Sequence, residues 1–319
     1  YSSKPIVASH SNARSLCNHP RNLTDEMIKA LAEQGGIAGI NFYPYFVREN
    51  GVSSADDLAE HVAHIYRVGG EDCIAIGTDF DGFDEGVTEI EHIGEMNLFY
   101  EAIKRNCDFM ESMTDDYTLR YGTGDWCAPF VGPAIGKNMG SYKCPVQVSD
   151  TGFFFNAANT IAKLAKMFNK PEDEEYYSAL ASKIRTVFRE RFFDRETFTV
   201  KGDCQTATAV MLYFGLYDGE EERVGLLNKL LAQIEEKDGH LDFGVLGNKF
   251  VMHTLGSMGE GNVGHRMLAQ RTFPGCQRWI DLGATTLWEC WNGGGSHNHH
   301  MFSDISSFLY KYVGGISPD

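Results

Sequence analysis

Basic residues and long apolar runs are both scarce in this sequence. Its 28 lysines and arginines face 44 aspartates and glutamates, which leaves a net charge of −16. No apolar stretch approaches the ~18 residues of a membrane span, and a chain of this charge repels nucleic-acid phosphates. The first residues also lack the basic, apolar and small-residue regions of a signal peptide. We therefore expect a soluble, cytoplasmic protein that binds small molecules, with neither membrane nor nucleic acid as a partner; its oligomeric state stays open.

Paired cysteines and a linker composition are also missing. The eight cysteines include no CxxC pair, and their irregular spacing in a long chain does not suggest a disulfide scaffold, so we expect reduced and mostly buried thiols. Only nine prolines occur, and no Pro- or Ser-rich stretch divides the chain. Any join between domains is therefore tight or lies inside a helix.

The sequence is long enough for two domains, since it has 319 residues and a typical domain has about 150. In its first part, short apolar runs alternate with helical patterns, from "PIVASH" and "TDEMIKALAEQ" to "CIAIGTDF". Thr24 is a suitable helix N-cap, and Gly35 and Gly36 form a suitable stop. The continuous apolar strands are typical of a parallel sheet covered on both faces. This part is therefore expected to be an α/β layer or barrel.

The strand pattern ends near Asn97, and apolar residues then recur at intervals of three and four, as in Phe155, Ala158 and Ile161. This spacing indicates amphipathic helices packed as hairpins. Pro171 stands where a first helical turn accepts proline. Further helices are expected at 203–216, 221–236, 248–270 and 303–313.

Several polar helix residues are interpreted as solvated surface. Glu190, Glu221 and Glu222 fall within expected helices, where acidic side chains are mostly exposed. His61 and His64 lie three residues apart, so both could face one metal ion, but a solvated helical face is the stronger expectation.

Four segments of the first part occur together in one order. They are "ASHSNARSLCNHPRNLTDEM", "GINFYP", "DLAEHVAHIYRVGG" and "IGTDFDG", and they resemble the membrane dipeptidase family of zinc peptidases (renal dipeptidase, peptidase family M19). The resemblance implies a (β/α)8 TIM barrel with a two-zinc site, whose active groups lie at the carboxyl ends of strands. His10 and Asp79 both end expected strands.

The same resemblance makes His10 a zinc ligand, Arg21 a clamp for the terminal carboxylate of a dipeptide, and Asp79 a proton-handling residue beside the metal-bound water. These residue types suit such roles. We expect the family's other metal ligands to precede Tyr1, which leaves the zinc site incomplete. Taken alone, a histidine at a strand end is more often a hydrogen-bonded structural group, and the carboxylates of "DFDG" are more often turn residues.

The second part carries the strings "FMESMTDDYTLRYGTGDWCAP", "GDCQTATAVMLYFGL", "HLDFGVLGNKF" and "GATTLWECWNGGGSHNHHMFSDISSFLYKYVGGISP". In this order they are similar to the C-terminal part of the α-L-rhamnosidase catalytic domain (glycoside hydrolase family 78). That family implies an (α/α)6 toroid, also called a six-hairpin glycosidase, and hydrolysis with inversion. Inversion needs one carboxyl as acid and another as base, about 6.5–9.5 Å apart.

The rhamnosidase resemblance makes Glu289 the catalytic base, with no cofactor. Asp125, Trp126, Trp288 and His299 are expected to face the sugar, because aromatic planes and polar groups suit a deoxysugar. The family's acid belongs to a motif of the type "DERLGWTGD", and no such string occurs here. The tryptophans could equally be core aromatics. We do not expect the "HNHH" tract to bind a metal ion, because adjacent side chains diverge.

We thus interpret the chain as a partial (β/α)8 barrel over residues 1–97 followed by a partial (α/α)6 toroid over residues 98–319. Both closed architectures are incomplete, so open strand edges and apolar faces predict marginal stability unless the two pieces cover one another. The leading hypothesis is a truncated α-L-rhamnosidase-type hydrolase that binds L-rhamnosides but is weak or inactive. The alternatives are a zinc dipeptidase-like hydrolase with an incomplete metal site and a non-enzymatic chimera of two gene fragments.

Overall fold

The computed structural model describes residues 6–83, 87–122, 124–129, 143–299 and 301–315. The chain divides into two compact units, one of Tyr1–Asn106 with Gly314–Asp319 and one of Cys107–Val313. The division between Asn106 and Cys107 falls inside helix α4 (Met96–Ser112). The join between the units is thus helical, which was one of the two predicted possibilities.

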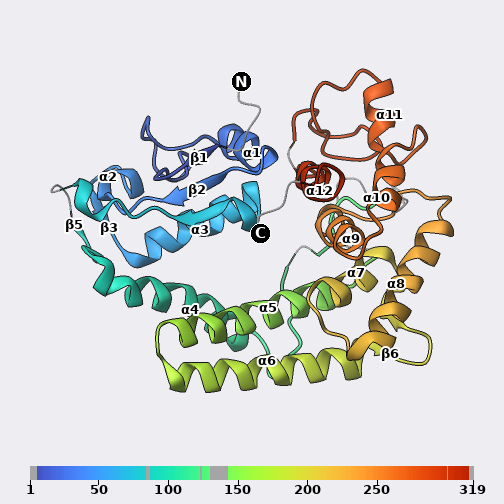
Figure 1. Ribbon diagram of the computed structural model, residues 1–319, viewed down its shortest axis with the longest axis horizontal. Helices are drawn as coiled ribbons and strands as arrows, with labels where there is room; N and C mark the ends of the chain where they lie inside the picture. Colours follow the sequence, from blue (N-terminus) through green and yellow to red (C-terminus); the bar gives the residue numbers. More distant parts are fainter. Residues whose placement is uncertain (1–5, 84–86, 123, 130–142, 300, 316–319) are drawn as a thin grey trace. The chain divides into compact units, whose positions relative to one another are not determined.

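The first unit is built on a short parallel sheet. Strands β1 (Val7–Ala8), β2 (Ile37–Ile40) and β4 (Ile74–Ile76) are hydrogen-bonded in the order β1-β2-β4. Helix α1 (Asp25–Glu33) leads from β1 to β2, and α3 (Ala55–Gly69) lies between β2 and β4 in the chain. The two helices contact each other and β2 (Figure 1). This confirms the predicted alternation of strand and helix.

The ends of these helices follow local rules. The Thr24 hydroxyl accepts a hydrogen bond from the Met27 amide at 3.2 Å, and the helix stops before Gly35, whose φ is +65°. Helix α3 begins with a capping box, in which Ser54 and Asp57 satisfy each other's backbone amides. The predicted N-cap and stop are therefore confirmed.

The core of the first unit lies between these helices and the sheet. Ile28 and Leu58 are fully buried against Ile40, and each such side chain stabilises the fold by about 1.5–3 kcal/mol. Val7 and Ile76, by contrast, are 59% and 50% exposed. The predicted sheet with both faces covered is therefore wrong for the two outer strands, because crossovers of one hand place both helices on the same face.

Short elements complete the first unit. Val7 pairs with Ile37 and Ala38 with Ile74, so the three parallel strands end at one edge. The complete barrel geometry implied by the family resemblance stays a prediction. The remaining elements are α2 (Pro44–Val47), β3 (Val52–Ser53) paired in parallel with β5 (Val87–Thr88), η1 (Glu71–Cys73), η2 (Phe80–Gly82) and η3 (Ile93–Glu95).

The second unit is helical and opens with a hairpin. Helices α5 (Val146–Met167) and α6 (Pro171–Phe192) pack along each other (Figure 1). Pro171 occupies the first turn of α6, as predicted, and the apolar stripe of α5 is buried at Ala158 and Ile161.

Six further α-helices follow in the described part of this unit. One predicted helix, 248–270, is in fact two, because the chain turns at Gly259, whose φ of +84° is a left-handed conformation that interrupts a helix. The elements after the hairpin are β6 (Phe193–Asp194) antiparallel to β7 (Thr199–Val200), α7 (Gln205–Tyr213), α8 (Gly219–Glu235), α9 (Val245–Ser257), α10 (Gly261–Leu268), α11 (Cys276–Asp281), α12 (Asp304–Phe308) and η4 (Leu309–Val313).

Glu222 corrects one surface prediction. Glu221 is exposed, as expected, but Glu222 is fully buried, with its two oxygens accepting a bidentate pair of hydrogen bonds from Arg189 at 2.7 and 2.9 Å. These bonds lower the pKa of Glu222. Its partner lies 33 residues away in the sequence, so the helical pattern around Glu222 does not reveal the pair.

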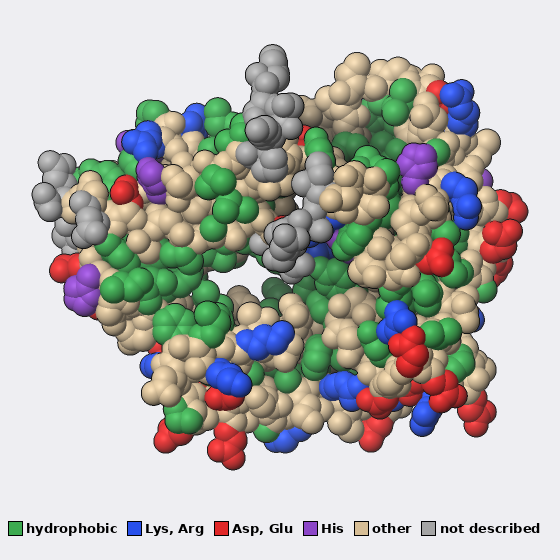
Figure 2. Space-filling model, viewed as in Figure 1, with side chains coloured by type: hydrophobic (Ala, Val, Ile, Leu, Met, Phe, Trp, Pro, Cys, Tyr) green, Lys and Arg blue, Asp and Glu red, His purple; other side chains and the backbone are tan. Residues whose placement is uncertain are grey.

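Many charged side chains lie on the surface (Figure 2). Acidic side chains gather around α6 and α8 in the view of Figure 2. None of the described helices is long and apolar enough to cross a membrane. All eight cysteines are described, none forms a disulfide, and five are buried.

Candidate functional site

Glu289 lies in a loop after α11, and hydrogen bonds between backbone groups join the two sides of this loop. The Glu289 amide donates to the Ser296 carbonyl, and the His299 amide donates to the Leu287 carbonyl, each at 2.9 Å. The Thr286 hydroxyl donates to the His297 carbonyl. We call residues 286–299 the Glu289 loop. These contacts bring its two ends together.

The Glu289 carboxylate is oriented by the segment of this loop around Ser296. Its Oε2 accepts a hydrogen bond from the Ser296 amide at 2.7 Å. A Cβ atom added at Gly295 would lie 2.4 Å from the same oxygen, and Gly295 has a φ of +74°. Glycine is thus required there for the close approach and for the left-handed backbone. The side chain of Glu289 is partly exposed.

The tryptophans of this region are mostly core residues. Trp288 is 7% exposed and stacks on His297, with ring centroids 4.2 Å apart. Trp291 is 2% exposed and stacks on Trp279 at 4.6 Å. Trp126 is only partly buried. Of the two predicted sugar-facing tryptophans, Trp126 therefore keeps more accessible surface.

Asp125 is buried, and its carboxylate accepts hydrogen bonds from backbone amides at the start of helix α9. It is 1% exposed, and it accepts hydrogen bonds from the amides of Gly244 at 3.0 Å and Gly247 at 2.9 Å and from the Thr206 hydroxyl at 2.5 Å. Burial raises the pKa of Asp125, and the hydrogen bonds oppose that rise. Both oxygens are occupied at the N-terminus of α9, where a carboxylate is favoured. The expected sugar contact of Asp125 stays a prediction, but this placement favours a structural role.

Two segments that carry predicted site residues of the second unit meet at a pair of cysteines. Residues 124–127 form a turn, and the Cys127 sulfur lies 3.8 Å from the Cys290 sulfur, next to Glu289. The turn that carries Asp125 and Trp126 therefore borders the Glu289 loop. His299 belongs to the same loop through its backbone and is partly buried.

Sequence reasoning missed the residues that position this site. Gly244 and Gly247 hold Asp125, and Gly295 makes room for the Glu289 carboxylate. The glycine-rich string "NGGGS" was the one available signal for a close backbone approach. In the "HNHH" tract, the His297 ring contacts the Gly293 carbonyl at 2.8 Å, and His300 lies outside the described residues.

In the first unit, His10 and Asp79 follow the outer strands of the parallel sheet at its carboxyl edge. Asp79 has a φ of +64° and accepts a hydrogen bond from the Asn41 amide group at 3.2 Å. His10 is hydrogen-bonded through Nδ1 to the Ser9 hydroxyl at 2.7 Å. The sheet thus carries both predicted residues to the edge where barrel chemistry occurs.

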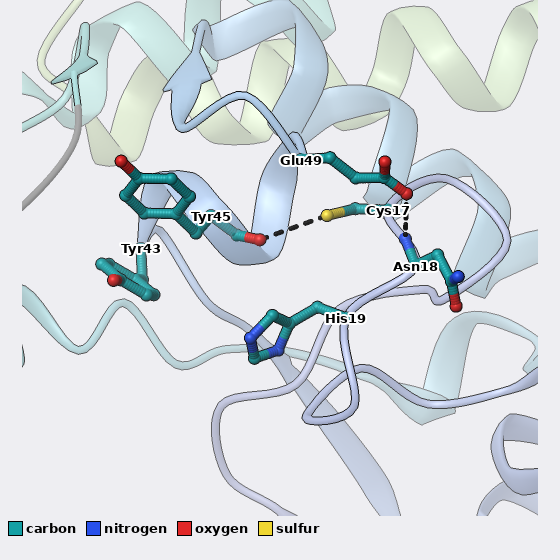
Figure 3. A pocket seen from close by; sticks show the side chains of 6 residues that line it. All are labelled: Cys17, Asn18, His19, Tyr43, Tyr45 and Glu49. Carbon is teal, nitrogen blue, oxygen red and sulfur yellow. Dashed lines mark hydrogen bonds between the residues drawn. The ribbon is translucent and has the colours of Figure 1, made fainter.

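A cavity of about 480 Å3 lies beside α2. Figure 3 shows the ring of His19 extending toward Tyr43. Arg21 is exposed, and its guanidinium lies over the Phe46 ring, 5.5 Å from the centroid. The cavity is lined by Cys17, Asn18, His19, Tyr43, Tyr45 and Glu49.

His61 corrects another surface prediction. It is 1% exposed, its Nδ1 accepts a hydrogen bond from the Ala13 amide at 3.1 Å, and its Nε2 donates to the Val47 carbonyl at 3.0 Å. His64 pairs with Asp25 at 2.8 Å. His61 is therefore a neutral core group, and burial lowers its pKa.

The donor groups do not fit a zinc site among the residues that the structure describes. Across those residues, no group of three or more histidine, cysteine, aspartate or glutamate side chains could hold a metal ion. A catalytic zinc ion normally has three protein ligands. His10 by itself does not meet this requirement.

Comparisons with known proteins match the two parts of the chain to different families. The model of the membrane dipeptidase family, peptidase family M19, matches residues 1–113. A dipeptidase of Schizosaccharomyces pombe that is described as uncharacterized is 38% identical over 104 residues, which cover 32% of this chain and 25% of that protein.

The second part matches α-L-rhamnosidases. An α-L-rhamnosidase of Formosa agariphila is 28% identical over 238 residues, which cover 71% of this chain and 25% of the relative. The crystal structure of the Streptomyces avermitilis α-L-rhamnosidase complexed with L-rhamnose is 28% identical, with a TM-score of 0.60, and the match covers 70% of this chain and 22% of that one. The chain thus spans about a quarter of the length of these relatives.

The largest match fixes the family. The model of the bacterial α-L-rhamnosidase six-hairpin glycosidase domain matches residues 92–313, which is more than half of the chain. The helical second unit agrees with such a domain. The chain therefore belongs to the bacterial α-L-rhamnosidase six-hairpin glycosidase family and carries a membrane dipeptidase-like segment at residues 1–113.

Proposed function

We propose that the second unit binds L-rhamnosides at the Glu289 loop and acts as an inverting α-L-rhamnosidase with Glu289 as its catalytic base. The family match over residues 92–313 supports this proposal, as does the similarity to a rhamnosidase crystallised with L-rhamnose. The observation that carries it is the orientation of the partly exposed Glu289 carboxylate by the Ser296 amide, with Gly295 leaving room beside it.

The chemistry assigned to Glu289 is the removal of a proton from water. In inversion, the base activates a water molecule on the face of the sugar opposite the leaving group. The hydrogen bond from Ser296 fixes one oxygen of Glu289, so the carboxylate is held in one orientation before substrate binds. Such positioning lowers the entropic part of the barrier.

We further propose that hydrolysis by this chain is slow. The leaving oxygen of the substrate needs an acid, and the family's "DERLGWTGD" type of motif does not occur in the sequence. General acid catalysis typically contributes about 100- to 10,000-fold to the rate. We expect the rate of rhamnoside hydrolysis to be lower than that of a complete enzyme by a factor in this range.

Calorimetric titration with L-rhamnose and a chromogenic rhamnoside assay test both parts. We expect measurable binding of L-rhamnose and weak turnover that Glu289→Gln abolishes. Glu221→Gln is the matched control, because that carboxylate is exposed on α8, and it should change neither signal.

Two results would contradict the proposal in different ways. A failure to bind L-rhamnose at millimolar concentration would remove the assigned ligand. Turnover equal to that of a complete enzyme, still abolished by Glu289→Gln, would keep the function and would show that another carboxyl of the chain serves as the acid.

A second candidate function concerns the first unit. The dipeptidase family match and the cavity lined by His19, Tyr43 and Glu49 support binding of a dipeptide or a similar small molecule there. Zinc is the cofactor of that family, but the described residues do not assemble a ligand set. Metal analysis of the purified chain is the test, and close to two zinc ions per chain together with dipeptide cleavage would contradict our view that the site is incomplete.

The third candidate is a chimera without enzymatic activity. The two family matches overlap at residues 92–113, which contain helix α4, so one helix continues both patterns. Sequencing of single DNA molecules across codons 90–110 tests this. Two separate genes at that place would show that the two parts do not belong to one natural chain. One continuous reading frame would show that the fusion of the two parts is real.

A further inference from the structure

Cys127 stands on a rigid turn. The Trp126 amide donates to the Gly124 carbonyl at 2.9 Å, and the Trp126 carbonyl accepts from the Val245 amide at 2.8 Å. Cys127 itself has a φ of +61°. Together with the buried carboxylate of Asp125, these contacts fix the turn to the start of helix α9.

Cys290 lies in the Glu289 loop, where hydrogen bonds of neighbouring residues hold the backbone in place. It lies between Glu289 and Trp291, and its carbonyl accepts a hydrogen bond from the Gly293 amide at 3.0 Å. The indole of Trp291 is buried and donates to the Phe243 carbonyl at 3.0 Å. The Cys290 thiol is therefore carried by the same anchored segment as the Glu289 carboxylate.

The two sulfur atoms lie 3.8 Å apart although 163 positions separate the cysteines in the sequence. The sulfur atoms of a disulfide bond are about 2.05 Å apart, so the two sulfurs must move closer by about 1.75 Å. Both side chains are partly exposed, whereas five of the other six cysteines are buried. We propose that Cys127 and Cys290 form a redox pair whose oxidation ties the turn of residues 124–127 to the Glu289 loop.

The oxidant that we assign is a low-molecular-weight disulfide. The Cys290 thiolate attacks one sulfur of that disulfide, breaks its S–S bond and releases one small thiolate. The Cys127 thiolate then attacks the Cys290 sulfur and releases the second small thiolate. The two protons of the cysteines end on the two released thiols, so the protein loses two electrons and the small disulfide gains them.

Hydrogen bonding and burial set the order of attack. Burial raises the pKa of the Cys290 thiol, and the contact with the Cys127 sulfur, which lies within hydrogen-bonding distance, partly opposes that rise. Burial raises the pKa of Cys127 more strongly. Because the pKa rises less at Cys290 than at Cys127, we assign Cys290 as the first nucleophile and Cys127 as the second.

Oxidation changes the site because Glu289 is the neighbour of Cys290. Closing the sulfur separation from 3.8 Å pulls the backbone beside Glu289 toward the turn. A misplacement of about 1 Å can cost about 100-fold in an enzyme's rate. On the basis of the proposed rhamnosidase function, we expect the oxidised form to bind L-rhamnose and turn over rhamnosides less well than the reduced form.

The test begins with peptide mapping of the full chain. The protein is incubated with oxidised glutathione, its remaining thiols are blocked, and its proteolytic peptides are analysed by mass spectrometry. We expect a linked Cys127–Cys290 peptide that disappears with dithiothreitol. Cys290→Ser should lose it, and Cys276→Ser, which changes a partly exposed cysteine outside the pair, should keep it.

Mapping of the unaltered chain keeps the proposal falsifiable even if a variant fails to fold. Glutathione that remains attached to Cys127 or Cys290, or linkage of other cysteines in their place, would overturn the redox pair. Titration of the oxidised and reduced forms with L-rhamnose then tests the consequence, and equal affinity would overturn it. No binding in either form would contradict the proposed function, while a mapped disulfide would still support the pair.

Discussion

Asp125 illustrates how burial decides what a carboxylate does. In the string "GDW" it resembles a sugar-facing residue, yet its oxygens accept from two backbone amides of the α9 N-terminus and from the Thr206 hydroxyl. Those three donors are supplied by residues 81 to 122 positions away. A motif locates such a residue, but only its partners reveal whether it contacts a ligand or another part of the chain.

This placement makes Asp125 a test of stability. Asp125→Ala leaves two amides and a hydroxyl without their acceptor, and each buried unsatisfied group costs about 1–3 kcal/mol. We expect the free energy of unfolding to fall by about 3 kcal/mol, measured by urea denaturation. The control is Asp115→Ala, at an exposed position of the same unit. An unfolding midpoint equal for both variants would contradict the capping role.

His61 gives a prediction about pH. Burial lowers its pKa in the folded state, while the unfolded chain has an ordinary histidine pKa of about 6.5. The unfolded state therefore takes up the proton first, and the stability that His61 contributes is lost as the pH falls below about 6.5. We expect His61→Gln to reduce this loss between pH 7 and pH 5 in urea denaturation of the chain.

His92 provides the comparison for that measurement, because its side chain is 66% exposed. His92→Gln should retain the pH dependence of the unaltered chain. If the two variants lose stability equally on acidification, then protonation of His61 is not a source of the acid sensitivity.

At the scale of the element, helix ends were the most predictable features. Thr24 and Gly35 act through contacts within a few residues, so their roles can be inferred from neighbouring letters. The interruption between α9 and α10 was missed although Gly259 stands there, because the apolar pattern continues through it. A left-handed φ at one residue ends a helix without changing the periodicity of its apolar side chains.

Thr24 yields the prediction at this scale. Thr24→Ala removes the acceptor for the Met27 amide and should lower the stability of the first unit by about 1 kcal/mol. Thr24→Ser keeps a hydroxyl and should restore most of that loss. The measurement is the denaturant midpoint of the transition that reports the first unit; equal midpoints for the alanine and serine variants would exclude a role for the cap.

At the scale of the whole molecule, each unit has its own interior. Leu58 is fully buried in the first unit, and Leu230 is fully buried in the second. Replacing a buried leucine by alanine typically costs about 2–5 kcal/mol. Compact units with separate cores tend to unfold as separate cooperative steps.

Calorimetry of matched variants tests this division. Leu58→Ala should lower the midpoint of one unfolding transition, and Leu230→Ala should lower the midpoint of another. The two variants remove the same side-chain atoms, so each serves as the control for the other. A single transition that both variants shift equally would mean that the two units unfold as one.

The fold class was largely predictable, because periodicity is a local property. Alternating strands and helices were expected before the α4 region and helices after it, and both are found. The predictions failed where a partner lies far away in the chain, as for Glu222 with Arg189 and for His61 with the Val47 carbonyl. The boundary at 97 and 98 and the individual site roles stay predictions.

The amino-acid sequence by itself determined the two family resemblances, the helix caps and the candidate base at Glu289, since motifs and short-range hydrogen bonds are written in neighbouring residues. The tertiary structure alone decided that Asp125 is enclosed at α9, that the Glu289 loop closes on Ser296, and that Cys127 meets Cys290. These outcomes depend on burial and on distances between remote segments, and such quantities exist only after the chain has folded.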